Sequence, residues 1–533
     1  MKKYLYIIVV CALALTSCRP MGDDLLSYGQ NDTQAFIMAG QSFEGQFIAF
    51  WNAMNENYCI WDYEEQFGMD WDEVYKTYLP TFRALDDSTR TEPVSDAELK
   101  ALYSQFLDSL HDGHSAFQIL NLQTGNRIVV NPNDDRNQRE RPQVYADEDN
   151  ITTLDAYRTS AVESRYRVLS YDETGSRAIV LQIIDTTANR LIAAATAYQQ
   201  AIDAAGGPDQ FNDTIYSAAT RIKENAQILL NYLAQPAVVK SQFPSLVNLY
   251  NDFANRYGIA AQQIGVDMTM IDAQMPSDDL KFIYFALFEG NIAYLRFGGF
   301  ALSAFLPDEA LSADTTTMYY AYQLAVRRVW HQWFDAIQTL SAKGQLGGVI
   351  IDVRNNGGGA TDDYQYVLGA MLPSGGWHSH TLRVKNGVGR LDFAPLTPFV
   401  VKTYSGPHAV ISQQPIVLLA NSHSVSMSEN TTWGVKSQPN GYVIGTRTWG
   451  GLSALNDSPD MYSTTYSGGF GERGVTPFYG YVPRFVGLFG KDQKILESIG
   501  ITPDKEVPLD VDYWKTQKRD NQLEAALDYI HAQ

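Results

Sequence analysis

Apolar residues recur at three- and four-residue spacing from Phe43 to about Ile119, and this period predicts a series of α-helices. The spacing is clearest in the stretches FIAFWNAMNENY, WDEVYKTYL and DAELKALYSQFLDSL. The aromatic residues of this region are predicted to form the core of a small bundle: Trp51, Tyr58, Trp61, Trp71 and Tyr75. We therefore expect an N-terminal helical bundle over residues 43–125.

Residues 126–280 are predicted to form a mostly helical insertion domain. The segment Arg177–Ile184 is rich in β-branched and apolar residues and predicts a strand. Long alanine-rich stretches with helical spacing follow it: Ala188–Ala205, Phe211–Leu233 and Ser241–Tyr257. The insertion therefore contributes mainly helices to the predicted architecture.

The period changes after Lys281. The stretches FIYFALF and NIAYLRF alternate around Glu289–Gly290, which predicts a β-hairpin. Helices and strands are then predicted in turn: a helix over Thr317–Lys343, a strand within 348–359, a helix over Asp362–Leu372, and strands at Ile416–Ala420 and Val443–Ile444. This alternation predicts an α/β core over residues 281–515, followed by a C-terminal helix over 516–533.

Composition narrows the class of protein. A chain of 533 residues is too long for one ordinary core, and 45% apolar residues with 32 tyrosines are typical of a globular protein. The net charge of −20 argues against a nucleic-acid partner, because phosphates would repel it. The same charge argues against electrostatic docking on anionic lipid.

The first residues resemble a bacterial lipoprotein signal. A basic start precedes an apolar run, Tyr4–Leu15, that is too short for a typical membrane-spanning helix, and Leu-Thr-Ser-Cys follows it. We expect a signal peptide over residues 1–17, lipidation of Cys18 and a polar tether over 18–42. The alternative is an ordinary secretory signal with a chance cysteine. Acidic residues at Asp23 and Asp24 resemble surface-export signals, so an outer-membrane lipoprotein, facing the periplasm or the surface, is expected.

The cysteines agree with this interpretation. Cys11 would leave with the signal and Cys18 would carry lipid, so Cys59 alone would remain in the mature protein. An intrachain disulfide is then impossible. Cys59 is predicted to be a small buried apolar residue.

The most informative stretch is PIVLLANSHSVSMSEN, residues 415–430. A predicted strand leads into alternating serines and then a predicted helix: Ser424, Ser426 and Ser428. A serine on such a turn lies where helix N–H groups can bind a developing oxyanion. The same run is also typical of a helix N-cap.

A second stretch, GVIIDVRNNGGG at 348–359, favours a catalytic role for the serine run over a helix-capping role. A hydrophobic strand ends in a charged pair and three consecutive glycines, whose backbone N–H groups can approach a ligand closely. The two stretches together resemble family S41 of the serine peptidases, which carries D-x-R-x-N-x-G-G and S-x-S-x-S-E motifs. The matching residues are Asp352, Arg354, Asn356, Gly357 and Gly358 in the first motif, and Ser424, Ser426, Ser428 and Glu429 in the second. The resemblance implies that Ser426 is the nucleophile and that the core is crotonase-like.

The resemblance leaves two choices of catalytic base. The tail-specific branch of the family uses a lysine at a position occupied here by Gly451, and no lysine lies nearby. Arg447 cannot replace it, because a guanidinium stays protonated. The tricorn-like branch uses a histidine in an L-x-D-G-H-[ST] motif, which the stretch LDSLHDGHS matches at His114. Histidine titrates near neutrality and can take and return a proton.

The tricorn-like branch also uses a glutamate near the carboxyl end. Glu497, in LESIGITPD, fits that position and would orient the histidine system. Tricorn carries a serine immediately before its histidine, where this chain has Gly113. As an alternative, Glu497 could pair with Lys494 on the surface.

Other residues have non-catalytic interpretations. His111 lies near the motif and His423 near Ser426, but neither stands at a motif position. Glu429 is predicted to be a first-turn helix acid, and Asp352 and Arg354 to hold the glycine loop as an ion pair.

The sequence thus predicts a membrane-anchored serine endopeptidase acting on peptides or unfolded-protein tails. Its site would comprise Ser426, His114 and Glu497, with an oxyanion hole from Gly357 or Gly358 and from Met427. No metal or cofactor is expected, and no glycine loop typical of a PDZ domain stands in the insertion. The alternatives are an inactive binding protein on the same fold and an acyl hydrolase acting on non-peptide esters.

Overall fold

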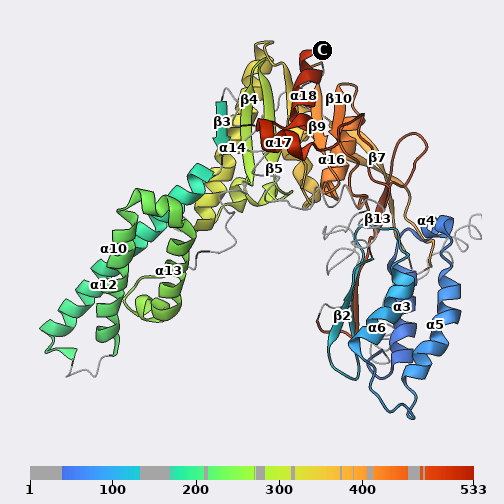
Figure 1. The fold of residues 1–533 in the computed structure, drawn as a ribbon, viewed down its shortest axis with the longest axis horizontal. Coiled ribbons are helices and arrows are strands. Elements are labelled where there is room, and N and C mark those ends of the chain that lie inside the picture. Colours follow the sequence, from blue (N-terminus) through green and yellow to red (C-terminus); the bar gives the residue numbers. More distant parts are fainter. Residues whose placement is uncertain are drawn as a thin grey trace, which may run out of the picture. The chain divides into compact units, whose positions relative to one another are not determined.

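The protein is described here by a computed structural model in which the chain divides into two compact units (Figure 1). The first unit comprises residues 1–142, 380–399 and 450–500, and the second comprises 143–379, 400–449 and 501–533. The structure describes residues 39–132, 162, 168–171, 173–208, 214–268, 271, 282–313, 318–372, 375–387, 389–404, 411, 413–453, 469–471 and 474–533. The predicted signal peptide (1–17), Cys18 and most of the tether lie outside these residues.

The first unit begins with the predicted helical bundle. Its helices are α3 (Phe43–Asn57), α4 (Trp61–Glu64), η1 (Glu65–Phe67), α5 (Trp71–Leu85) and α6 (Asp96–Leu107). The side chains of Ser42, Asp70 and Ser95 accept hydrogen bonds from first-turn N–H groups of α3, α5 and α6. Each long helix therefore begins at a polar cap.

Aromatic packing forms the core of this unit. Tyr58, Trp61 and Trp71 are buried as predicted, and Trp51 and Tyr75 pack against them. Cys59 is also fully buried. The predicted aromatic bundle core is therefore confirmed.

The bundle packs on a four-stranded sheet of order β11-β12-β1-β2. The strands are β1 (Ala116–Leu120), β2 (Arg127–Val130), β11 (Gly469–Phe470) and β12 (Phe478–Tyr481). The expectation of helix as far as Ile119 was wrong at its end, because Phe117 and Ile119 alternate into the core as strand residues. A further strand, β13 (Phe485–Leu488), pairs with residues 381–384 of β7 (Trp377–Val384), which neighbours β8 (Thr397–Val401).

The second unit is built on a seven-stranded sheet of order β14-β10-β9-β6-β5-β4-β3. Its strands are β3 (Val168–Tyr171), β4 (Ile283–Phe288), β5 (Ile292–Phe297), β6 (Gly348–Asp352), β9 (Ile416–Ala420), β10 (Gly441–Gly445) and β14 (Lys505–Glu506). The strands from β14 to β5 in this order are parallel to one another. β4 pairs antiparallel with β5 on one side and with β3 on the other. The predicted hairpin around Glu289–Gly290 is confirmed as β4–β5.

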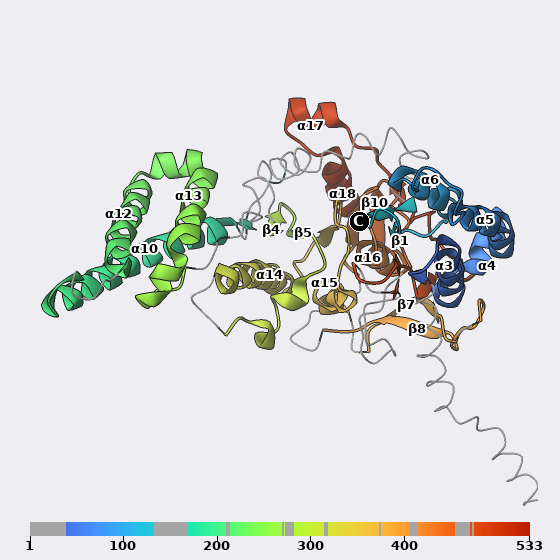
Figure 2. The same ribbon diagram turned by 90° about the horizontal axis from the view of Figure 1, so that it is seen from below.

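Helices cover both faces of this sheet (Figure 2). On one face, α18 (Asn521–His531) packs Leu523, Leu527 and Ile530 against the strands. On the other lie α14 (Met318–Ala342) and α16 (Met427–Lys436). The predicted α/β class with an N-terminal helical bundle is confirmed.

The described part of the insertion contains three long helices, α10 (Glu173–Ala204), α12 (Thr214–Leu233) and α13 (Pro236–Gln263), besides the sheet strands β2 and β3. The strand predicted at Arg177–Ile184 is wrong, since these residues belong to α10. Val180 and Ile184 lie one helical turn apart in the buried core shared with α12 and α13. Tertiary packing on that apolar stripe overrides the local β propensity.

Two predicted helices are shorter than expected. Asp362–Leu372 forms only η4 (Thr361–Asp363), α15 (Tyr364–Val367) and η5 (Gly369–Met371). The C-terminal helix predicted at 516–533 is α18 alone, preceded by a separate α17 (Val511–Gln517). Lys518 ends α17 in a left-handed conformation (φ 55°) and Asp520 caps α18. No helix within the described ranges is long and apolar enough to span a membrane.

Candidate active site

Ser426 lies on the turn that joins β9 to α16 in the second unit. It is the N-cap of α16, with φ 58° and ψ −115°. A non-glycine residue rarely adopts a positive φ, and such strain persists only where the surroundings hold it. Strained residues of this kind are concentrated at functional sites.

The three alternating serines have different environments. Ser424 Oγ donates to the Val353 carbonyl (2.8 Å) and Ser428 Oγ donates to the Asn356 carbonyl (2.7 Å), and both side chains are buried. Ser426 is half-buried and forms a capping box with Glu429 at the start of α16. The amide of Glu429 also donates to the Ser426 main-chain carbonyl (2.9 Å). The outer serines therefore hold the glycine loop, whereas the Ser426 hydroxyl binds no loop carbonyl among the described residues.

Gly358 packs its backbone directly against this turn. A Cβ atom added there would lie 2.7 Å from Ser426 Cβ and 2.8 Å from Met427 N, at a φ of +90°. The Gly358 N–H donates to Asn356 Oδ1 (2.9 Å). An added Cβ at Gly357, by contrast, would meet no atom within 4 Å. Glycine at position 358 is thus required by the close approach.

Two backbone amides next to this close contact lack a hydrogen-bond acceptor among the described residues: that of Gly357, which precedes Gly358, and that of Met427, which follows Ser426. Met427 is the first residue of α16, so its N–H lies at the positive end of the helix. The predicted oxyanion donors at Gly357 and Met427 are compatible with this geometry. The predicted donor at Gly358 is not, because its N–H is already bound.

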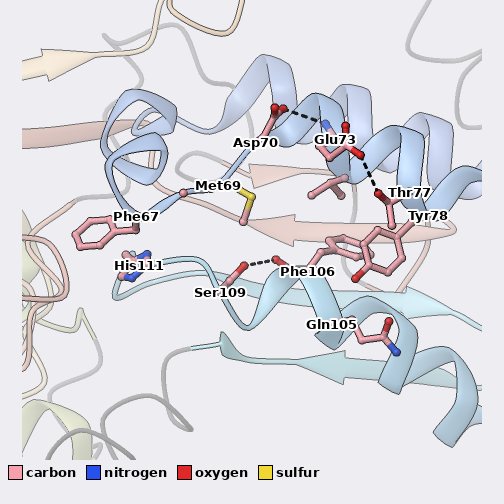
Figure 3. A pocket seen from close by; sticks show the side chains of 12 residues that line it. Phe67, Met69, Asp70, Glu73, Thr77, Tyr78, Gln105, Phe106, Ser109 and His111 are labelled. Atoms are coloured by element: carbon pink, nitrogen blue, oxygen red, sulfur yellow. Dashed lines mark hydrogen bonds between the residues drawn. The ribbon is translucent and has the colours of Figure 1, made fainter.

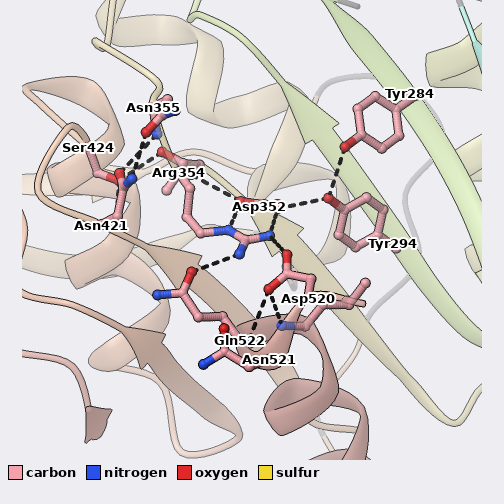
Figure 4. Close-up of polar contacts among 12 residues, drawn as sticks. Tyr284, Tyr294, Asp352, Arg354, Asn355, Asn421, Ser424, Asp520, Asn521 and Gln522 are labelled. Carbon is pink, nitrogen blue, oxygen red and sulfur yellow. Dashed lines mark hydrogen bonds and ion pairs between the residues drawn. The ribbon is translucent and has the colours of Figure 1, made fainter. Parts of the chain in front are cut away.

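A buried polar network holds the strand end that carries the glycine loop (Figure 4). The Arg354 guanidinium forms ion pairs with Asp352 (2.5 Å) and Asp520 (2.7 Å) and donates to Gln522 Oε1 (2.8 Å). Tyr294 donates to Asp352 from the neighbouring strand (2.8 Å). The ion pair predicted between Asp352 and Arg354 is present, and it ties β6 to the start of α18.

Asparagines join the glycine loop (residues 357–359) to the serine turn (residues 421–426). Asn355 N–H donates to Asn421 Oδ1 (2.9 Å), and Asn421 Nδ2 donates to Asn355 Oδ1 (2.6 Å). Val425 N–H donates to the Asn356 carbonyl (3.1 Å). These bonds run between the carboxyl ends of the parallel strands β6 and β9, where ligands bind in open α/β sheets.

Glu429 occupies the first turn of α16 and is fully buried. Its Oε2 accepts from Ser426 N–H (3.2 Å) and its Oε1 accepts from Thr448 Oγ1 (2.6 Å). The prediction of a first-turn helix acid is confirmed. Its carboxylate supports the backbone of the turn that carries Ser426.

His114 lies in the first unit, on the turn between α6 and β1. Asp112 Oδ1 accepts from His114 N–H (2.9 Å) and Ser115 N–H (2.6 Å), which shapes the turn. The ring is half-buried, and its Nδ1 has no hydrogen-bond partner in the described part of the chain. Burial lowers the pKa of His114, and the Asp112 charge opposes part of that change. The imidazole is therefore held neutral near pH 7, the form that accepts a proton.

Glu497 lies with His114 in the first unit and is fully buried. Its Oε1 accepts from Gly113 N–H (2.5 Å), and its Oε2 accepts from Leu452 N–H (2.8 Å) and Ser453 N–H (2.6 Å). The carboxylate binds the backbone one residue before His114. Its influence on the ring therefore passes through the main chain.

The backbones of Gly113 and Gly451 lie in close contact. A Cβ atom at Gly113 would lie 2.3 Å from Gly451 Cα, so a serine at position 113 cannot be accommodated. Gly451 stands where the tail-specific branch carries its lysine. Both departures from the related motifs thus belong to one backbone contact beside the histidine turn.

His111 has a different environment from His114. Its Nδ1 lies 2.8 Å from Glu64 Oε2, and its ring stacks on Phe67 with centroids 3.9 Å apart. It lines a pocket of about 380 Å³ between α5 and α6 (Figure 3). The other lining residues are Phe67, Gly68, Met69, Asp70, Glu73, Val74, Thr77, Tyr78, Gln105, Phe106 and Ser109.

The structure therefore groups the predicted site residues in two sets. Ser426, Met427 and the glycines belong to the second unit, and His114 and Glu497 belong to the first. Sequence reasoning assigned Tyr58 to the bundle core only, and it gave no role to two further buried residues around the histidine turn, Glu64 and Asp112. Asp112 stands inside the D-G-H motif, and that position was the available signal. No group of three or more His, Cys, Asp or Glu side chains that could hold a metal occurs in the ranges described above.

Comparison with known proteins identifies the domain. Residues 291–507 match the model of peptidase family S41. No curated protein matches the chain in sequence. A candidate peptidase from Parabacteroides merdae resembles it in structure, with 16% identity, a TM-score of 0.44 and coverage of 92% of this chain and 96% of that one.

Two further solved structures resemble the chain. Mature CPAF shows 12% identity and a TM-score of 0.43, with coverage of 92% of this chain and 96% of that one. Tricorn protease shows 19% identity and a TM-score of 0.23, with coverage of 41% of this chain and 20% of that one. Residues 291–507 are thus similar to peptidase family S41, and the protein is a serine-type peptidase.

Proposed function

We propose that this peptidase is an endopeptidase acting on peptides or unfolded-protein tails, with Ser426 as nucleophile and His114 as general base. One observation carries the choice of nucleophile. The hydroxyls of Ser424 and Ser428 donate to loop carbonyls, whereas the Ser426 hydroxyl donates to no loop carbonyl among the described residues and lies on a strained helix-start turn. That environment is typical of a serine held for attack on a carbonyl.

The proposed reaction needs a neutral imidazole. His114 would take the Ser426 hydroxyl proton as oxygen attacks the scissile carbonyl, and would return it to the leaving amine. Water would then release the acyl group by the same steps in reverse order. The lowered pKa of His114 supports this role, because the free base remains available at neutral pH.

The proposed oxyanion hole consists of the Gly357 and Met427 amides. Neither amide has another acceptor in the described chain; Gly357 precedes the glycine that touches Ser426, and Met427 adds the field of the helix terminus. Of the two glycines that the sequence suggested, Gly357 is favoured, because Gly358 N–H is bound to Asn356.

Glu497 is proposed as the third member of the site, with a positioning role. Its carboxylate holds Gly113 N–H and the amides of Leu452 and Ser453.

Replacing Ser426 by alanine tests the proposal. A fluorophosphonate probe should label the wild-type protein at Ser426, and the Ser426→Ala variant should lose both labelling and peptide cleavage by several orders of magnitude. A folded wild-type protein that is not labelled would favour the inactive binding protein. Faster turnover of p-nitrophenyl esters than of a peptide library would favour the acyl hydrolase.

We also propose that the peptidase is a lipoprotein of the outer membrane, anchored through Cys18. The support is the basic start, the short apolar run and the Leu-Thr-Ser-Cys sequence. Cells fed a labelled fatty acid should label the wild-type protein, and the Cys18→Ala variant should lose the label. Equal labelling of both would contradict the anchor.

A further inference from the structure

We propose that a buried network of Tyr58, Glu64 and Asp112 is a positioning device for His114. The inference rests on the proposed function, in which His114 is the base. In this inference the three residues orient the His114 side chain for catalysis, in addition to stabilising the bundle. All three are fully buried in the first unit.

The evidence begins with the backbone of residues 111–115. Four of its amides donate to buried carboxylates. The pairs are His111 N with Glu64 Oε1 (2.7 Å), Gly113 N with Glu497 Oε1 (2.5 Å), His114 N with Asp112 Oδ1 (2.9 Å) and Ser115 N with Asp112 Oδ1 (2.6 Å). Hydrogen bonds to ionised groups are shorter and stronger than neutral ones.

Asp112 is the carboxylate that acts on His114 itself. Besides the two amides on Oδ1, its Oδ2 accepts from Ser115 Oγ (2.5 Å) and contacts Tyr58 Oη (2.9 Å). Four polar groups therefore hold one side chain that has no exposure to water. Such complete satisfaction fixes the orientation of the turn, and with it the direction of the His114 side chain.

Tyr58 connects the two acidic residues on either side of the turn. Its hydroxyl lies 2.5 Å from Glu64 Oε1 and 2.9 Å from Asp112 Oδ2. Burial and the two neighbouring carboxylates raise the pKa of Tyr58 well above its ordinary value, so the hydroxyl stays protonated. One proton can serve only one carboxylate at a time, and the phenol therefore couples Glu64 to Asp112.

Glu64 joins the network to the bundle. It is the last residue of α4, and its two oxygens bind His111, one through the amide and one through the ring at 2.8 Å. The His111 ring in turn lies against Phe67 at the wall of the pocket (Figure 3). Glu64 thus fixes the turn at its beginning, Glu497 in the middle and Asp112 at its end.

Burying three carboxylates beside one turn is costly, because each loses its hydration. An apolar core would stabilise the bundle without that cost. A positional role explains the arrangement, since a catalytic base displaced by about 1 Å can lose roughly 10²-fold in rate.

The principal test replaces Tyr58 by phenylalanine, which removes the hydroxyl and keeps the ring that packs on Trp61. We expect kcat to fall about tenfold with KM and folding unchanged, as a misdirected base requires. Tyr103→Phe is the matched control: Tyr103 is buried in the same bundle, and its hydroxyl has no hydrogen-bond partner within the described structure. That control should keep wild-type kcat.

A second test separates positioning from stability. Asp112→Asn keeps an oxygen for the amides of His114 and Ser115 and gives Tyr58 a donor, so the fold should persist. It also removes the charge that raises the pKa of His114, so the acidic limb of kcat/KM should move to lower pH. Asp112→Ala should lose the turn geometry and most of kcat.

The outcomes distinguish this inference from the proposed function. If Ser426→Ala is inactive while Tyr58→Phe and Asp112→Asn keep the wild-type kcat and pH profile, the network is structural only and the inference is wrong. If the wild-type protein cleaves nothing, the proposed function fails. NMR titration of the His114 ring in the full chain then still decides whether Asp112 acts on it, because an unchanged pKa in Asp112→Asn would contradict the network.

Discussion

The serine turn and the histidine turn are held by different chemistry. Neutral hydrogen bonds from Ser424, Ser428 and the paired asparagines hold the serine turn at the ends of two parallel strands, together with one buried carboxylate, that of Glu429. Three buried carboxylates hold the histidine turn, which lies on a connection between a helix and a strand. The first turn is held mainly by hydrogen bonds between strand ends, whereas the second is held mainly by ionised groups.

This difference predicts how each turn fails. The serine turn should be sensitive to added volume, because backbones touch there. The histidine turn should be sensitive both to volume at Gly113 and to the loss of single charges. Four experiments, ordered by expected effect, would break or sharpen this contrast.

The largest effect is expected at Gly358. Alanine there would place its Cβ 2.7 Å from Ser426 Cβ at a left-handed φ, so the serine turn must shift. Gly358→Ala should lower kcat/KM by roughly 10²–10³, the loss typical of a disrupted oxyanion hole. Gly258→Ala, on α13, is the control, because its Cβ would meet no atom within 4 Å. Equal losses in both variants would contradict the packing argument.

The next effect is expected at Gly113. Gly113→Ser restores the serine of the tricorn motif but places a Cβ 2.3 Å from Gly451 Cα. Peptidase activity should fall by about 10² because the turn that carries His114 moves. Gly258→Ser, on α13 with nothing within 4 Å, should leave the rate unchanged. Improved activity in Gly113→Ser would show that the backbone contact is dispensable.

A smaller effect is expected at Glu497. Glutamine keeps the shape but provides one acceptor oxygen for amides that now share two. Glu497→Gln should destabilise the protein by about 1–3 kcal/mol and lower kcat more than it raises KM. Denaturant unfolding and steady-state kinetics would check both quantities. A variant with unchanged stability and rate would remove Glu497 from the site.

The smallest effect concerns pH. Burial lowers the pKa of His114 below its ordinary value of 6.5, so the base loses its proton at a lower pH than a free histidine would. The acidic limb of the kcat/KM profile should therefore lie below 6.5. A limb above that value would mean that another group, or a differently placed His114, limits the reaction.

Much of the fold follows from local sequence patterns. The strand at Ile416–Ala420 has the predicted bounds, and the hairpin around Glu289–Gly290 forms as expected. The strand predicted at Arg177–Ile184 failed because an apolar run reads alike in a strand and in a buried helix. Only the packing of α10 on its neighbours distinguishes the two.

The candidate site, too, could be predicted only in part from the sequence. Residue types at motif positions were enough to nominate Ser426, His114 and Glu497, because nucleophile, base and orienting acid need those side chains. They could not show that Gly358 N–H is occupied or that Glu497 binds amides. Those facts depend on partners far apart in the chain, such as Gly113 and Glu497.

By itself the sequence determined the alternation of helix and strand, the family motifs and the residue types able to do the chemistry. The tertiary structure decided which two of the three similar serines donate their hydroxyls to loop carbonyls, and which carboxylates surround the histidine turn. The physical reason is that periodicity reports the face on which a residue lies. Hydrogen-bond partners and close backbone contacts arise only when distant segments meet.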